Sequence, residues 1–289
     1  MASAPDLVAS FFTLAGAGFG EPPRNTFIER CEAAAEAGFT GIGLHADDLP
    51  RTIAAGVDVP QMKAVLRNNG LALVEIEFLG GWASGSGQNG GISPDLGAIE
   101  EVADALGGRQ VSAGEFSSGL ALDDEDLLDQ VAKALRVNAD RLAAKGLLVA
   151  VEAFPWSALG NMAIAIDVLR RAGAANAGLL IDVWHFFNCG GHPDQLVDLP
   201  AAGITGFQLN DGPLVHENFL HHARAERRLP GEGDLDVVGL IEAARLAGFT
   251  GPYCVEANTP EFRNLPVAEA ARRAADASAG ALRAAGVVI

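Results

Sequence analysis

Four oxygen-bearing side chains in the second half of the sequence each follow a short apolar run. They are Glu152 after LLVAV, Asp182 after GLLI, Gln208 after GITGF and Glu256 after PYCV. An apolar run that ends in a polar side chain is typical of a buried parallel strand whose carboxyl end bears chemistry. Carboxylate and amide oxygens suit a divalent cation. We therefore predict that these four residues bind one Mn²⁺ or Mg²⁺ ion, with Co²⁺ as an alternative.

Further polar residues lie close to the ends of predicted strands. His185 comes three residues after Asp182; it is expected to bind a substrate oxygen or carry a proton, and the alternative is a buried structural histidine. His45 ends an earlier predicted strand and is a candidate for substrate binding. Glu75 and Glu77 lie on one face of a strand, with Glu77 nearer its end and Glu75 a candidate buried polar group.

Two more residues are candidates for contact with the substrate. Arg227 is expected to bind substrate oxygens, although Arg228 competes for this role and a solvated surface arginine is the alternative. Trp184 follows the end of a predicted strand, and it is expected either to form an apolar wall of the pocket or to pack in the core.

The elements that must position these residues alternate between strand and helix. Strand-length apolar segments are predicted at residues 7–14, 40–45, 71–78, 109–114, 147–153, 178–183, 203–209 and 252–257. Helical spacing is predicted at 26–37, 60–69, 94–106 (with Ser93 as N-cap), 123–145, 159–172, 235–247 and 266–285. The glycine-rich segment 80–91 is either a lid or a surface loop.

Eight such alternations without a break in composition predict an α/β fold, a single (β/α)₈ TIM barrel that forms one domain over residues 1–289. A doubly wound sheet is the alternative, but no GxGxxG follows the first predicted strand.

Composition narrows the class of protein. The 289 residues are 49% hydrophobic, which is enough for a large core and excludes a disordered chain. A net charge of −17 disfavours nucleic acid or an anionic membrane as a partner. Three cysteines without a CxxC motif disfavour a disulfide framework and fit a cytoplasmic location. Residues 7–18 resemble a signal-peptide core, but no Lys or Arg precedes Arg24, so a first barrel strand is favoured.

The run VEAF…IDVWHF…FQLND…RRLPGEGDLD…GPYCVEANTPEFR resembles the xylose-isomerase-like TIM-barrel superfamily. This superfamily includes sugar phosphate isomerases and epimerases, inosose dehydratases and 3-dehydroshikimate dehydratases, and the resemblance is best over residues 147–263. It implies that Glu152, Asp182 and Glu256 bind a divalent metal. The fourth position is usually His in the family and is Gln208 here. That glutamine, and the stretch GPYCVEANTPEFR, resemble the bacterial 3-dehydroshikimate dehydratase branch.

The resemblance implies a metal-dependent sugar or cyclitol isomerase or epimerase that acts through a metal-stabilised enediolate. It also implies that Glu152 and Glu256 move protons, alongside His185. The alternative is a lyase resembling 3-dehydroshikimate dehydratase or inosose dehydratase, which uses the same enolate chemistry. A non-catalytic binding barrel would be expected to lack an intact metal site. The expected partner is a small polyol, sugar or keto-acid, and formation of a homo-oligomer is left open.

Overall fold

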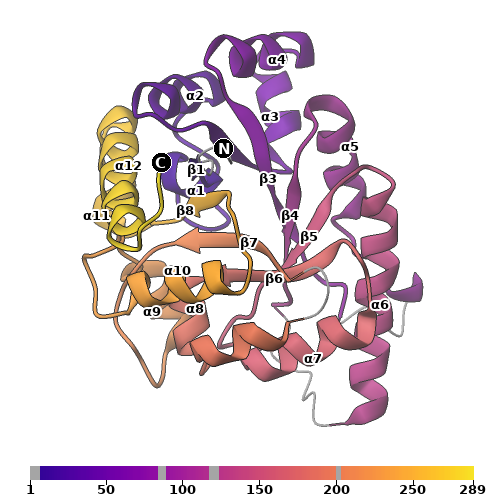
Figure 1. Cartoon of the computed structure of the whole chain (residues 1–289). Coiled ribbons are helices and arrows are strands. Elements are labelled where there is room, and N and C mark those ends of the chain that lie inside the picture. The colour runs from indigo at the N-terminus through magenta and orange to yellow at the C-terminus, as the bar shows by residue number, and fades with distance from the viewer. Residues whose placement is uncertain (1–6, 84–88, 117–123, 200–202) are drawn as a thin grey trace.

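Eight parallel strands form a closed barrel in the computed structural model, which describes residues 7–83, 89–116, 124–199 and 203–289 (Figure 1). The strands pair in sequence order, and β8 closes the barrel against β1. Their bounds are β1 Leu7–Ala9, β2 Gly41–His45, β3 Ala72–Leu79, β4 Gln110–Ala113, β5 Leu148–Val151, β6 Ala177–Asp182, β7 Ile204–Leu209 and β8 Tyr253–Val255. The predicted (β/α)₈ barrel is confirmed.

Helices follow the strands and surround the barrel (Figure 1). They are α1 Phe11–Leu14, α2 Phe27–Glu36, α3 Asp48–Ala54, α4 Val59–Asn68, α5 Leu96–Leu106, α6 Glu125–Ala143, α7 Met162–Ala172, α8 Val183–Asn188, α9 Phe219–Ala225, α10 Val237–Leu246, α11 Pro260–Arg263 and α12 Val267–Ala284, with short 3₁₀ segments η1 Asn89–Gly91 and η2 Pro193–Asp198. No helix within the described ranges is both long enough and apolar enough to span a membrane.

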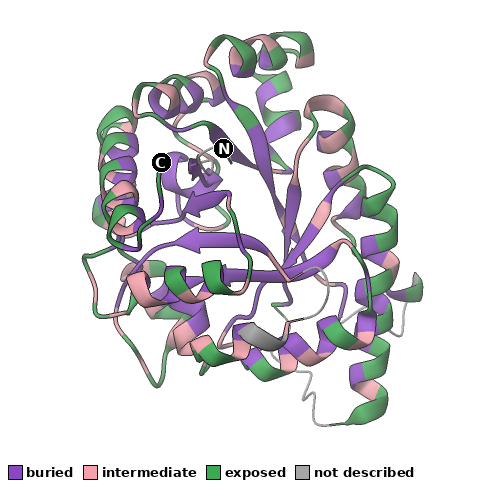
Figure 2. Cartoon of the chain, in the orientation of Figure 1, coloured by how far each residue is buried: buried purple, intermediate pink, exposed green. Residues whose placement is uncertain are grey.

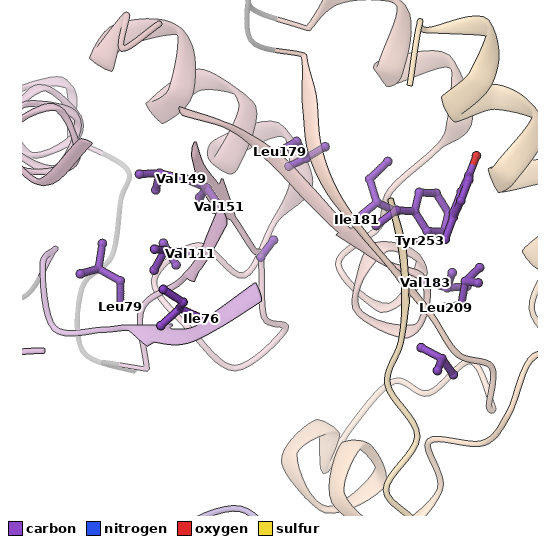
Figure 3. Packing of buried hydrophobic residues seen from close by; sticks show 14 of the residues in the cluster. Ile76, Leu79, Val111, Val149, Val151, Leu179, Ile181, Val183, Leu209 and Tyr253 are labelled. Atoms are coloured by element: carbon purple, nitrogen blue, oxygen red, sulfur yellow. The ribbon is translucent and has the colours of Figure 1, made fainter. Parts of the chain in front are cut away.

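The apolar core lies between the barrel and its helices. The strands are buried over most of their length, whereas the helices alternate buried and exposed faces (Figure 2). Aliphatic side chains from neighbouring strands pack together, as Ile76, Val111 and Val149 do (Figure 3). The polar strand residues lie on the alternate positions, because successive side chains of a strand point to opposite faces. The barrel interior is therefore left to Glu75, Gln208 and their neighbours.

Two predicted boundaries are wrong. The first strand ends at Ala9, and α1 begins at Phe11, because a short apolar run does not distinguish a buried helical turn from a strand. Helix α5 begins at Leu96 with Asp95 at its N-cap position, not Ser93. The Ser93 hydroxyl instead accepts a hydrogen bond from the Asp95 amide in the preceding turn. Residues 84–88 of the glycine-rich segment, and position 123 of the predicted helix 123–145, lie outside the described residues.

A buried ion pair fixes the unpredicted helix α3 against α2. Arg30 is fully buried, donates to the carbonyl oxygen of Thr26 and pairs with Asp48 at the start of α3. Its guanidinium also lies 4.9 Å from the ring centroid of Phe11. Both charges are removed from water, so each depends on the other for compensation.

Arg30→Met should lower the free energy of unfolding by about 3–5 kcal/mol, because it leaves a buried carboxylate unpaired. Urea titration followed by circular dichroism measures this change. The double variant Arg30→Met/Asp48→Leu is the matched control, and it should recover most of the loss. A single variant as stable as the wild type would show that the pair contributes nothing net.

Candidate active site

The four predicted metal ligands meet at one end of the barrel. Asp182 ends β6 and Gln208 lies in β7, where the two residues are direct partners in the strand register. Glu152 follows β5 and Glu256 follows β8. All four are at most 5% exposed. The barrel therefore brings together residues more than 100 positions apart in the chain, as the parallel arrangement of strands requires.

Asp182 organises the residues around it. Its Oδ1 accepts from the backbone N–H of His185 at 2.9 Å, which makes Asp182 the N-cap of α8. Its Oδ2 accepts from Asn210 Nδ2 at 2.6 Å and from Arg227 Nη1 at 2.7 Å. The three-residue spacing from Asp182 to His185 is the spacing of a helix cap. By capping α8, Asp182 thus places its own carboxylate and the imidazole of His185 next to each other.

His185 is buried beside Glu152, with its Nε2 3.7 Å from Glu152 Oε1 and 3.4 Å from Arg227 Nη1. Burial lowers the pKa of His185 to about 3, so its imidazole is neutral near pH 7. Because Arg227 can only donate, Nε2 acts as the acceptor. His185 thus offers the Nε2 lone pair as an acceptor and an Nδ1–H donor that has no partner among the described residues.

Arg227 is buried and bridges two of the carboxylates. Its Nη1 pairs with Asp182 Oδ2 and its Nη2 pairs with Glu256 Oε1, both at 2.7 Å. Arg228 does not line the same cavity; its Nη1 donates to the carbonyl oxygen of Glu232. Arg227 is therefore the arginine of the pair that faces the site.

Asp211 holds the loop that carries Arg227. Its Oδ1 accepts from the amides of Gly212 and Leu235, its Oδ2 accepts from the amide of Gly231, and its backbone pairs with Arg228. Gly231 has a φ of +85°, a conformation that favours glycine. Asp211 and the PGEG stretch therefore form one structural unit, which the sequence pattern indicated only as a motif.

The donor atoms at the strand ends fit a divalent cation. Glu152, Asp182 and His185 each offer one atom, and these atoms lie within 4.8 Å of one another. Gln208 Nε2 donates to Glu75, but the buried Gln208 Oε1 has no hydrogen-bond partner among the described residues. A buried unpaired acceptor is costly unless a cation or donor satisfies it. His185 thus joins the four predicted residues as a candidate ligand, while Glu256 is held by Arg227.

Burial dominates the electrostatics of the carboxylates. It raises the pKa of Glu152 and Glu77 well above the usual range, and neighbouring carboxylates raise both further. Burial also raises the pKa of Glu256 to about 7, against the opposing effect of Arg227. The site consequently holds protons at neutral pH that ordinary carboxylates would release.

A cavity of about 330 Å³ opens over these residues. Its polar lining includes Glu152, Gln208, Glu256, His185 and Arg227. The predicted substrate-binding residues His45 and Glu77 also line it. Trp184, the fourth predicted substrate-binding residue, is fully buried and is not among the described residues that line the cavity.

Aromatic rings also line the cavity, and two of them, Phe154 and Trp156, contact the ring of His185. Phe116 and Phe154 stack with centroids 5.1 Å apart and planes 10° apart, and Trp156 stacks on Phe154 at 5.5 Å and 14°. Phe78 tilts against the first two rings. Phe78, Phe116 and Phe154 were not singled out in the sequence, although each lies at or just beyond the end of one of three consecutive strands, β3 to β5.

The model of the family described as xylose isomerase-like TIM barrel matches residues 31–284. The chain belongs to this family. Within it, 3-dehydroshikimate dehydratase of Pseudomonas aeruginosa is 30% identical over 246 residues, which are 83% of this chain and 37% of the dehydratase. The chain therefore spans well under half of that relative. Inosose isomerase of Bacillus velezensis is 24% identical, covering 61% of this chain and 63% of the isomerase.

The family fold is also seen in the crystal structure of the IolI protein with a bound zinc atom. It superposes with a TM-score of 0.82 over 97% of this chain and 98% of IolI, at 17% sequence identity. At this identity the similarity shows the shared barrel alone.

The raised pKa of Glu256 determines how the stability of the protein should depend on pH. The pKa of Glu256 is about 7 in the folded protein against 4.5 ordinarily, so the folded state binds more protons between these values. Stability without metal should therefore fall as the pH rises from about 5 to about 7.5. A cation competes with those protons, so excess Mn²⁺ should raise the thermal midpoint more at about pH 7.5 than at about pH 5.

Thermal unfolding with and without Mn²⁺ at the two pH values measures this dependence. Glu256→Gln cannot ionise at this position, so its midpoint without metal should depend less steeply on pH. Equal stabilisation by Mn²⁺ at both pH values would contradict the expected competition.

Proposed function

We propose that the protein is a metal-dependent lyase that removes water from a small cyclic hydroxy-ketone acid of the 3-dehydroshikimate type. The observation that carries this proposal is that buried carboxylates and stacked aromatic rings line the same cavity. Loss of water from 3-dehydroshikimate, followed by enolisation, gives an aromatic dihydroxybenzoate. Flat, increasingly unsaturated rings pack well on aromatic side chains. The 30% identity to a 3-dehydroshikimate dehydratase supports the same choice.

The residues that would hold the cation are the four predicted ones, Glu152, Asp182, Gln208 and Glu256. Because Arg227 pairs with Glu256, His185, which lies with Glu152 and Asp182, is the alternative fourth ligand. When bound, a divalent cation supplies Lewis-acid stabilisation for negative charge that develops on the substrate carbonyl oxygen. The donor set is three carboxylates and one amide oxygen, which favours Mg²⁺ or Mn²⁺ and admits Co²⁺.

Glu152 is the proposed base. It takes the proton from the carbon beside the substrate carbonyl, and the electron pair of that C–H bond forms the enolate. Burial raises the pKa of Glu152, which opposes the lowering that a bound cation would bring. His185 stays neutral beside Glu152, so it is proposed to donate from Nδ1, which has no partner among the described residues, to a substrate oxygen.

Glu77 is the proposed acid. It lines the cavity, its pKa is raised, and its buried Oε1 makes no hydrogen bond with any described residue. A protonated Glu77 donates to the leaving hydroxyl, so that the C–O bond breaks, a C=C bond forms from the enolate pair and water departs. His45 at the end of β2 lines the same cavity and contributes to binding.

Arg224 is proposed to bind the substrate carboxylate. It lines the cavity, is exposed, and makes no ion pair with any described residue. Arg227 was the predicted arginine for substrate oxygens, but its two Nη atoms are taken by Asp182 and Glu256. Arg227 therefore shapes the charge of the site, while Arg224 recognises charge on the substrate.

The predicted isomerase or epimerase activity stays a second candidate, because proton abstraction beside a carbonyl begins both reactions. The inosose isomerase relative favours it, although that match covers 61% of this chain at lower identity.

Mn²⁺-loaded protein should convert 3-dehydroshikimate to a dihydroxybenzoate. Proton NMR in deuterated water monitors this conversion. Dehydration replaces the ring methylene signals with aromatic ones. Chelated protein should be inactive, and Glu152→Gln should lose most turnover. Deuterium exchange beside the carbonyl without loss of water, or isomerisation of inosose in a parallel assay, would favour the isomerase instead.

His185→Ala should lower turnover by a factor of about 10²–10³, the usual cost of removing one donor to a substrate oxygen that gains negative charge. Mn²⁺ affinity should change little if His185 contacts the substrate rather than the metal. His192→Ala is the control, since His192 is 70% exposed. Isothermal titration with Mn²⁺ separates the two roles, and a large loss of affinity in His185→Ala would identify His185 as a metal ligand.

A further inference from the structure

Glu75 is a buried carboxylate that the proposed reaction does not use. It lies two residues before Glu77 on β3, is fully buried and does not line the cavity. Four donors converge on it. Its Oε1 accepts from Ser112 Oγ at 2.8 Å, Gln110 Nε2 at 3.4 Å and Gln208 Nε2 at 3.3 Å, and its Oε2 accepts from Cys254 Sγ at 3.3 Å.

The network determines which way each amide points. Arg109 can only donate, and its Nη1 contacts Gln110 Oε1, so Gln110 turns its NH₂ group toward Glu75. A carboxylate accepts, so Gln208 also directs its NH₂ group to Glu75. The Oε1 of Gln208 is the atom left over, and it has no partner among the described residues.

The packing of the barrel interior leaves room for this arrangement. A Cβ atom at Gly206 on β7 would lie 2.7 Å from Gln110 Nε2, which is closer than real Cβ contacts allow. Arg109 also donates to the carbonyl oxygen of Thr205 at 3.0 Å, next to that glycine. The network therefore joins β3, β4, β7 and β8. Within it, Arg109 donates to Gln110, and Gln110 and Gln208 both donate to Glu75.

We infer that Glu75 is a positioning residue that holds the Gln208 carboxamide with its nitrogen on Glu75 and its oxygen free for the cation. The inference rests on the proposed function, because it assigns a purpose to one ligand of the metal site. Its physical basis is the difference between a carboxylate and an amide. A carboxylate accepts only from the NH₂ group of Gln208, whereas a glutamine at position 75 pairs with either end of that carboxamide.

Glu75→Gln should weaken Mn²⁺ binding about 10–100-fold, the usual cost of losing a residue that orients a metal ligand. The reason is that the turned carboxamide presents NH₂ in place of oxygen. Glu115→Gln is the matched control, because Glu115 is also buried and accepts from the Ala83 amide instead of from Gln208. It should bind Mn²⁺ as the wild type does. Circular dichroism confirms that each variant is folded.

A double-mutant cycle tests whether Glu75 acts through Gln208. In a Gln208→Ala background, Glu75→Gln should cost no more than about twofold in Mn²⁺ affinity, the scatter found for unrelated changes. Isothermal titration of wild type, the two single variants and the double variant gives this comparison without any activity assay.

Three results would overturn the inference. An unchanged affinity in Glu75→Gln would show that Gln208 needs no orienting partner. An equal loss in the Gln208→Ala background would show that Glu75 acts as a distant negative charge. A wild type without Mn²⁺ affinity would overturn the metal-dependent function as well. Conversely, if the cycle behaves as expected while no substrate is dehydrated, the positioning role stands and the proposed reaction fails.

Discussion

The repulsion among buried carboxylates is the constraint on which this structure depends. Glu75, Glu77, Glu152, Asp182 and Glu256 lie inside or at the end of one barrel, and each is at most 5% exposed. Two like charges 4 Å apart repel by about 4 kcal/mol at an effective dielectric constant of 20. A barrel that buries these carboxylates is stable only if hydrogen-bond donors, bound protons or cations compensate most of their charge. Arg227 compensates Asp182 and Glu256, neutral donors compensate Glu75, and raised pKa values favour the protonated forms of Glu77 and Glu152.

Arg227 supplies the compensation at Asp182 and Glu256, and its own position has to be secured. A buried arginine without its partners would cost more than it contributes. Asp211 secures it by gathering the amides of the following loop, so the loop cannot move away without losing several hydrogen bonds. Asn210 adds a neutral donor to Asp182. Asn210 and Arg227, which both follow β7, thus stabilise the charge of Asp182 at the end of β6.

The order of strands and the position of the polar strand ends were predictable from the sequence, because an apolar run followed by Glu, Asp or Gln marks both. Burial of Glu75 below Glu77 followed from the two-residue period of a strand. Short helices such as α1 and α3 were missed, since four to seven residues carry too little periodicity to be distinguished from strands or loops.

Contacts between segments that are distant in the sequence could not be predicted from it. Nothing in the sequence places Arg227 between Asp182 and Glu256 or brings Gln110 to Glu75. The stacked rings of Phe116 and Phe154 depend on how the loops after β4 and β5 turn, which local spacing does not encode. Trp184 shows the reverse case: it follows a strand end, yet it packs into the interior because Asp182 begins a helix there.

The barrel interior departs from the aliphatic filling that is usual in this fold. Val8, Val74 and Cys254 form its small apolar cluster, and the space beside them holds Glu75 with its four donors. Burying that carboxylate costs free energy that its hydrogen bonds only partly return. If the proposed function is correct, this carboxylate holds the neutral oxygen of Gln208 in one orientation at the metal site. The carboxylate end would then provide the enolate chemistry of the proposed reaction, and Phe78 of β3, with Phe116 and Phe154 beyond β4 and β5, would contact the substrate ring.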